Sequence, residues 1–162
     1  MTAMAADATA VRDAFRSVPF FSHLTEEELG RIIALGRVVA YPKDMVLFHE
    51  GDIGEAFYIV VDGSIRISKT IPGVGEESMY FVERGNWFGE MALIDAFPRS
   101  ATAVANQPAE VLFLDRNGLM SLFDKDPILA RKILWAFCRT LSLRLRETND
   151  RITALFTVAG RF

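Results

Sequence analysis

The chain of 162 residues is long enough for one domain with a hydrophobic core, and its 51% hydrophobic content and 13 phenylalanines exclude a disordered protein. A formal net charge of −3 excludes a general electrostatic attraction to nucleic acid. The single cysteine, Cys138, excludes an internal disulfide and is typical of a reducing cytoplasm.

The first part of the chain predicts two short helices. Residues 1–6 are rich in alanine and are expected to fray. Over residues 7–18, apolar side chains recur at the spacing of one helical face: Val11, Ala14, Phe15 and Val18. Thr25 and Glu28 have the spacing of a capping box, which predicts a second helix that extends to Gly36.

Signals for export or membrane insertion are missing from the sequence pattern. The N-terminus has no basic start followed by an apolar run, as a secretory signal would. No apolar stretch reaches the roughly 18 residues of a membrane span. We therefore expect a soluble, cytoplasmic protein without a membrane partner.

From Arg37 onward the pattern changes to short strands between turn residues. Seven strands are expected, at 37–41, 45–49, 57–61, 64–69, 78–82, 102–105 and 110–115. Asp62 and Gly63 favour a type I′ turn, so the strands on either side of them are expected to form the clearest hairpin. Many short, regularly spaced strands predict a mainly β fold, a jelly-roll-like barrel of about eight strands with flanking helices.

One stretch among these strands, residues 88–103, contains the residues best suited to bind a ligand. Gly89 lets a ligand approach the backbone, and Arg99 can hold two phosphate oxygens with one guanidinium. Between them, residues 91–94 can form a helical turn with free N–H groups. Glu90 is suited to accept a hydrogen bond from a sugar hydroxyl, with Arg99 near enough to balance its charge. The pattern predicts a pocket for a nucleotide with few phosphate charges, since no Walker loop is present.

This stretch resembles the phosphate-binding cassette of cyclic nucleotide-binding domains, the family of the bacterial catabolite activator protein and of protein kinase A regulatory subunits. Phe88-Gly89-Glu90, an apolar turn and Pro98-Arg99-Ser100-Ala101-Thr102 carry the likeness. The resemblance implies that Glu90 binds the ribose 2′-hydroxyl and Arg99 the cyclic phosphate, with backbone groups near Gly89, Ala92 and Ser100 completing the site. The candidate ligand-binding residues of the cassette are Phe88, Gly89, Glu90, Met91, Ala92, Arg99, Ser100 and Ala101.

The same fold also occurs in enzymes, but the residues of this chain do not favour a catalytic site. A metal-dependent cupin enzyme needs a histidine cluster, and the chain has only His23 and His49. Cys138 lies in a helical pattern without a histidine beside it. We therefore expect a binding module without catalytic residues, metal or cofactor. The alternative that stays open is a degenerate interaction domain, in which Glu90 and Arg99 form only a structural ion pair.

The C-terminal region predicts a long helix that pairs with a second copy. Asp126 can cap this helix and Pro127 suits its first position. A heptad seam follows: Leu134, Cys138, Leu141, Leu145, Thr148, Ile152, Leu155, Ala159 and Phe162. Arg144 and Arg151 are expected to flank the seam. The pattern predicts a parallel homodimer through residues 127–162.

Within this helix, Trp135 and Phe137 are expected to pack on the barrel, while Thr148 interrupts the apolar seam. The segment 145–152 resembles the dimer helix of the catabolite activator protein, in which a Thr-Ser pair reads the adenine amino group. The resemblance places Thr148 over the base of its own subunit's ligand and Asn149 over the base of the other's. Asn149 departs from the family's serine. The competing reading is that both residues only set the helix register.

Taken together, these features predict a single domain, residues 1–162, with N-terminal helices (1–36), a β-roll (37–115) and C-terminal helices (116–162). The resemblance implies a sensor that prefers cyclic AMP, with cyclic GMP as the alternative because Ser100 is ambiguous. Ligand binding would draw residues 89–94 inward and act on an unknown protein partner through the C-terminal helix. No basic recognition helix is present, so we expect no direct binding to nucleic acid, and no DNA-binding domain.

Overall fold

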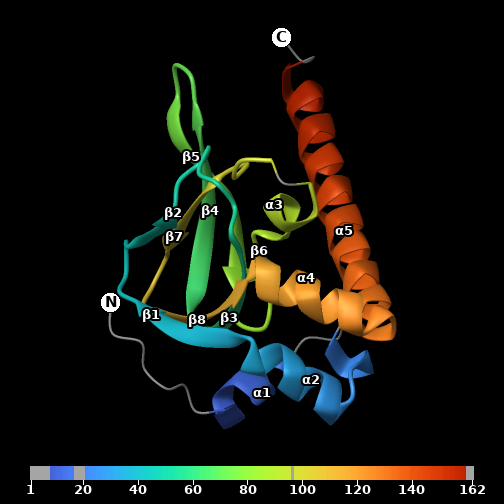
Figure 1. The fold of residues 1–162 in the computed structure, drawn as a ribbon. Helices are drawn as coiled ribbons and strands as arrows, with labels where there is room; N and C mark the ends of the chain where they lie inside the picture. The colour runs from blue at the N-terminus through green and yellow to red at the C-terminus, as the bar shows by residue number, and fades with distance from the viewer. Residues whose placement is uncertain (1–7, 17–20, 96, 160–162) are drawn as a thin grey trace.

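The computed structural model describes residues 8–16, 21–95 and 97–159, which form a β-sandwich with most of its short helices at one end and a long C-terminal helix that runs past its side (Figure 1). Residues 1–6, expected to fray, lie outside the described residues, as do Val18 and Phe162 of the expected helices.

The strands form two four-stranded antiparallel sheets. One sheet has the order β1 (Gly36–Tyr41), β8 (Ala109–Asp115), β3 (Ala56–Asp62), β6 (Trp87–Phe88). The other has the order β2 (Val46–Phe48), β7 (Thr102–Ala105), β4 (Ser64–Ile71), β5 (Gly75–Glu83). Consecutive strands cross repeatedly from one sheet to the other, so the jelly-roll-like architecture is confirmed, although the sheets do not close into a barrel. β6 is the strand that the sequence pattern did not predict.

The hairpin expected at Asp62 and Gly63 is wrong. β3 and β4 belong to different sheets, so these two residues form a corner between the sheets. Gly63 has φ +79°, and a Cβ there would lie 2.4 Å from the Pro108 carbonyl oxygen. The hairpin that does form joins β4 to β5 through residues 72–74.

β3 is covered on both of its faces. Its residues from Ala56 to Val61 are all buried. Phe57, Ile59 and Val61 pack on the helices, while Tyr58 and Val60 point into the sandwich. A strand covered on both faces is continuously apolar, like β3, and shows no polar side that would reveal its partner.

The helices are α1 (Ala8–Arg16), the 3₁₀ turn η1 (Phe21–His23), α2 (Glu26–Ala34), α3 (Glu90–Ile94), α4 (Arg116–Lys125) and α5 (Pro127–Ala159). The capping box of α2 is confirmed, because Thr25 and Glu28 exchange both expected hydrogen bonds. Asp126 caps α5 as expected, since its carboxylate accepts the N–H of Leu129 at 2.9 Å.

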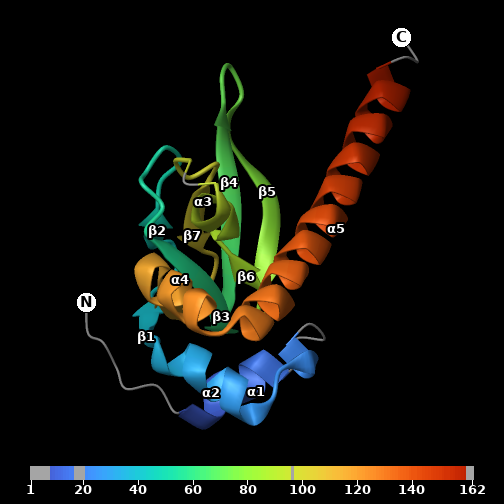
Figure 2. The same cartoon turned by 45° about the vertical axis from the view of Figure 1, so that its right-hand side comes forward.

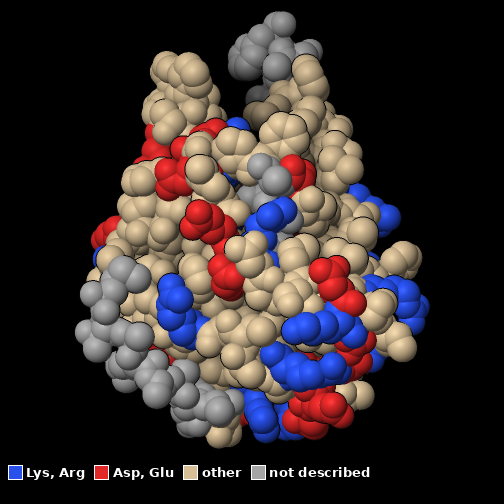
Figure 3. Space-filling model, in the orientation of Figure 1, with Lys and Arg blue, Asp and Glu red and all other residues tan. Residues whose placement is uncertain are grey.

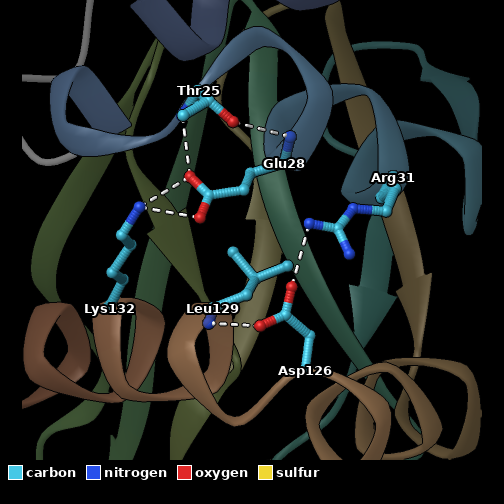
Figure 4. A network of polar contacts seen from close by, with 6 residues as sticks. All are labelled: Thr25, Glu28, Arg31, Asp126, Leu129 and Lys132. Carbon is cyan, nitrogen blue, oxygen red and sulfur yellow. Dashed lines mark hydrogen bonds and ion pairs between the residues drawn. The ribbon is translucent and has the colours of Figure 1, made fainter.

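Two ion pairs join α2 to the first turns of α5 (Figure 4). Lys132 donates to both carboxylate oxygens of Glu28, at 2.7 and 2.8 Å, and Arg31 pairs with Asp126 at 2.9 Å. Burial opposes the charge of Glu28, but the hydrogen bonds from Lys132 and Thr25 outweigh it and lower the pKa of this carboxyl. In the space-filling view, basic and acidic side chains gather at the lower right, where α2 and the start of α5 lie (Figure 3).

α5 contacts the fold near its start and then leans away from the sheets (Figure 2). Phe137 is buried on the helical side of the core, as expected, but Trp135 is 67% exposed, so its expected packing is wrong. Arg144 and Arg151 were expected only to flank a seam. Instead Arg144 donates to the Trp87 carbonyl and Arg151 to the Met79 carbonyl. Among the described residues, no helix combines the length and apolar character needed to cross a bilayer.

Candidate functional site

The candidate site begins at the turn between β6 and α3. Gly89 is the residue before α3 and has φ +81°, ψ +9°, a left-handed conformation that glycine adopts without strain. A Cβ at this position would lie 2.7 Å from Nη1 of Arg99. Glycine is therefore required both by the backbone conformation and by the approach of the guanidinium.

Arg99 is a buried cation with no carboxylate partner. The residue is 5% exposed, and Nη1 donates to the Gly89 carbonyl at 3.0 Å and Nη2 to the Ala56 carbonyl at 2.7 Å. Its guanidinium lies 4.3 Å from the centre of the Phe48 ring. Burial lowers the pKa of Arg99. No ion pair joins Arg99 to an acid within the described chain, and its buried Nε has no hydrogen-bond partner there.

Glu90 is paired with a residue that the sequence pattern did not connect to it. It is 1% exposed, and Nη1 of Arg144 donates to Oε1 at 2.5 Å. The structural pair of Glu90 with Arg99, which the alternative interpretation called for, is not formed among the described residues. Burial raises the pKa of Glu90, opposed by Arg144 and more weakly by Arg99. Oε2 is buried and has no partner among the described residues.

Arg144 holds this carboxylate from α5. Its Nη2 donates to the Trp87 carbonyl at 2.7 Å, and its guanidinium lies 4.9 Å from the centre of the Tyr80 ring. Glu90 and Arg144 are 54 positions apart. No local signal joins them, because the heptad spacing of α5 places Arg144 beside a seam and says nothing of what it reaches in the β-sandwich.

Gly89, Glu90 and Arg99 line one pocket, whose volume is about 30 Å³ without the open space at its mouth. Seven of the eight cassette candidates line it, and the side chain of Ala92 lies outside what the structure describes. The sequence interpretation missed three further lining residues: Phe48, Ile67 and Tyr80. The sequence placed Phe48 in a strand but gave no sign that it would contact Arg99. That contact depends on how β2 folds over the cassette.

The two base-reading candidates on α5 are not brought into this pocket. Thr148 and Asn149 are exposed and are not among its lining residues. The hydroxyl of Thr148 donates to the Arg144 carbonyl one helical turn earlier, at 2.8 Å. The Ser100 hydroxyl, which does line the pocket, lies 3.7 Å from the Met91 sulfur.

The chemistry of the pocket follows from its two buried charged groups. Arg99 supplies positive charge that no acid neutralises by contact, which suits an anionic ligand group. Glu90 supplies one free carboxylate oxygen, which suits a hydroxyl donor. Among the described residues, no group of three or more His, Cys, Asp or Glu side chains could hold a metal ion.

Comparison with known proteins agrees with this geometry. The model of the cyclic nucleotide-binding domain family matches residues 38–126. The cyclic AMP receptor protein of Thermus thermophilus is 34% identical over 137 residues, which cover 85% of this chain and 62% of that protein. The chain spans between 54% and 62% of the length of its first curated relatives.

Solved structures extend the likeness. A cyclic nucleotide-binding domain from Methylobacillus flagellatus has 31% identity and a TM-score of 0.79, covering 89% of this chain and 81% of that one. The regulatory domain of Toxoplasma gondii protein kinase A, crystallised with cAMP, has 30% identity and a TM-score of 0.63, covering 70% and 43%. With the family model spanning more than half of its residues, this chain belongs to the cyclic nucleotide-binding domain family.

Proposed function

We propose that this chain is a regulatory module that binds a cyclic nucleotide, preferably cyclic AMP, in the cassette pocket. The observation that carries the proposal is the buried Arg99, which has no ion pair among the described residues, in the same pocket as Oε2 of Glu90, which has no hydrogen-bond partner among them. A cyclic phosphate carries one negative charge, which Arg99 would neutralise. The ribose 2′-hydroxyl would donate to Oε2 of Glu90, while Oε1 keeps its bond from Arg144.

Calorimetric titration with cyclic AMP and cyclic GMP in parallel tests this proposal. Saturable binding is expected, with cyclic AMP bound more tightly. Arg99→Ala should weaken binding by about 100-fold, the cost of losing two charge-assisted hydrogen bonds of roughly 1.5 kcal/mol each. Arg99→Lys should restore part of the loss, because lysine keeps the charge but not the fork.

Arg84→Ala is the matched control, since Arg84 is exposed in the turn between β5 and β6 and has no ion pair among the described residues. Thermal melting should show that each variant is folded. If neither nucleotide binds the folded wild-type protein, the degenerate-domain alternative replaces the proposal.

Base preference is the finer part of the proposal. Without ligand, the Thr148 hydroxyl bonds the Arg144 carbonyl and is not turned to the pocket. We infer that ligand binding moves α5 so that Thr148 reaches the base. Thr148→Val should then reduce the preference for cyclic AMP over cyclic GMP. Thr153→Val is the matched control, because Thr153 makes the same bond to its own helix, to the Asn149 carbonyl at 2.9 Å. If both variants keep the same preference for cyclic AMP over cyclic GMP, Thr148 does not contact the base, and Ser100 becomes the next candidate for that contact.

Transmission through α5 is a further part of the proposal. Arg144 connects the pocket carboxylate to α5, so a ligand that changes the bonding of Glu90 changes a contact that holds this helix. Such a ligand signals only if it favours one arrangement of α5 over another.

The seam of α5 supports pairing with a second copy. Leu145, Ile152 and Leu155 are 61%, 45% and 70% exposed, too much apolar surface to leave free on one helix. Leu145→Glu should lower the mass found by sedimentation to that of a monomer. Leu143→Glu, a change at a 58% exposed position off the seam, should leave the dimer intact. A wild-type monomer at high concentration would contradict the homodimer.

A further inference from the structure

A third face of α5 is turned neither to the fold nor to the seam. We call it the Trp135 face, and it consists of Arg131, Trp135, Arg139, Ser142 and Arg146, all exposed. Successive residues of a helix lie about 100° apart, so Trp135 is about 100° around the helix from the seam residue Leu134. The next residues, Ala136 and Phe137, are buried against the fold. Pairing of two copies along the seam therefore does not account for this face.

Trp135 is the most prominent feature of the face. The side chain is 67% exposed, and it borders three hollows of the surface. Leu24 borders the first, Leu143 the second, and Phe123 the third. The seam residue Cys138 also borders the second and the third, so the first hollow is the one that lies clear of the seam. An exposed indole with hollows around it, each lined partly by apolar side chains, is typical of an anchor in a protein interface.

The charges of the face are of one sign and unpaired. Arg131, Arg139 and Arg146 have no ion pair or hydrogen bond from their guanidinium groups within the described chain. They differ in this from Lys132 and Arg144 on the same helix, which are engaged by buried carboxylates.

The surroundings of the face hold little negative charge. His23 and Lys132 border the first hollow beside Leu24, and the charge of Lys132 is already paired with Glu28. Among the residues described as lining the three hollows, Asp124 is the only acid, and it borders the third alone. The chain as a whole has a net charge of −3, so this is a local reversal of sign.

We propose that the Trp135 face docks an acidic segment of a partner protein. Carboxylates of the segment pair with Arg131, Arg139 and Arg146, and an apolar side chain fills a hollow beside Trp135. The three arginines extend over about 22 Å of helix at 1.5 Å per residue, longer than a small ligand and suited to roughly seven residues of extended chain. The apolar hollows favour a protein segment over a phosphate backbone, which offers no apolar group to fill them.

The docking does not depend on the cassette pocket, so its test uses the full chain without nucleotide. Random peptides displayed on phage are selected on the wild-type protein. Selected peptides should be enriched in Asp and Glu beside Leu, Phe or Trp. One of them, synthesised, should shift the fluorescence of Trp135, because the other tryptophan, Trp87, is only 3% exposed. Selected sequences without acidic enrichment would overturn the proposal.

Variants locate the binding on the face. Trp135→Ala should weaken peptide binding by about tenfold or more, as the loss of an interface anchor does. Arg131→Glu with Arg139→Glu should abolish it, and binding to the wild type should weaken as the salt concentration rises. The matched control is Lys43→Glu with Arg84→Glu, two exposed cations on loops of the β-sandwich, which should leave affinity unchanged.

Three further arms separate this partner from the other occupants of the face. Vesicles of phosphatidylserine and a random DNA duplex should bind more weakly than the acidic peptide at the same salt concentration. Tighter binding to either, abolished by Arg131→Glu with Arg139→Glu, would overturn the assignment to protein. Sedimentation of Trp135→Ala should equal that of the wild type, and a loss of dimer would mean that a second copy covers the face.

Discussion

Nη1 of Arg144 on α5 lies 2.5 Å from Oε1 of Glu90 on α3, a buried contact between residues 54 positions apart. The carboxylate proposed to receive the ribose is thus held by the helix proposed to carry the signal. Arg144 also donates to the Trp87 carbonyl, so one side chain joins β6, α3 and α5. The contacts of Arg144 therefore join the pocket to α5 in the absence of ligand.

Removing Arg144 should destabilise the unliganded protein. Arg144→Ala leaves Glu90 as a buried carboxylate without a cation, and we expect a loss of about 3 kcal/mol in the free energy of unfolding, the lower end for one partner of a buried pair. Chemical denaturation measures it. Arg146→Ala, two positions later and unpaired in the described chain, should change stability by less than about 0.5 kcal/mol. Equal effects of the two changes would show that the pair contributes nothing.

Neutralising Glu90 should stabilise the unliganded protein and weaken nucleotide binding. Burial raises the pKa of Glu90. Between the ordinary carboxyl pKa and this raised pKa, the folded chain keeps a proton that the unfolded chain has lost, so stability falls as the pH rises through that window. Glu90→Gln removes this loss, and its melting temperature at neutral pH should exceed that of the wild type.

The control for Glu90→Gln is Glu83→Gln, at an exposed position on β5. This change should alter neither melting temperature nor affinity. A lower melting temperature for Glu90→Gln would mean that the bond from Arg144 outweighs the cost of burying the charge. Combining Glu90→Gln with Arg144→Ala should recover part of the stability lost in Arg144→Ala alone, as expected for two residues in contact.

The ion pair of Glu28 should make stability depend on pH in the opposite sense. The hydrogen bonds of Lys132 and Thr25 overcome burial and lower the pKa of Glu28. The resulting stability is present in full above the ordinary carboxyl pKa and is lost as the pH falls through the lowered pKa of the folded state. Glu28→Gln should cost about 2 kcal/mol at neutral pH, since it weakens both a helix cap and a partly buried ion pair.

Denaturation of Glu28→Gln at neutral and at acidic pH checks this expectation. The difference from the wild type should shrink at acidic pH, where the wild-type carboxylate also takes up a proton. Glu27→Gln, one position earlier and exposed, should have little effect at either pH. If the difference in the free energy of unfolding between Glu28→Gln and the wild type does not change with pH, the loss comes from packing alone.

Gly89 should be essential for nucleotide binding. Gly89→Ala places a Cβ 2.7 Å from Nη1 of Arg99 and 3.2 Å from the ring of Tyr58, so the guanidinium must move. We expect affinity to fall by more than tenfold in titration. Gly51→Ala is the matched control, because Gly51 has φ +90° and nothing within 4 Å of the added Cβ. Both changes should cost about 1–2 kcal/mol of backbone strain, but affinity should fall in Gly89→Ala only.

Features that depend on neighbours along the chain were predictable from the sequence. The capping box of Thr25 with Glu28, and the cap of Asp126 on Leu129, each involve residues three positions apart. A close approach to the backbone at Gly89 was expected from its missing Cβ, but its left-handed conformation was not predicted. Arg99 and Gly89 are ten positions apart, and a single short turn brings them into contact.

Features that depend on distant segments were decided by the tertiary structure. A type I′ turn at Asp62 and Gly63 agrees with local propensity, yet β3 pairs with β8 and β6 and packs against the helices, while β4 belongs to the other sheet. The position of Trp135 on α5 indicated an apolar contact, but the fold covers the adjacent face instead. Periodicity shows that a helix has an apolar side, and the packing of the other elements decides which side is covered. The partner of Glu90 follows the same rule, since Arg144 reaches it only because α5 crosses the end of the cassette.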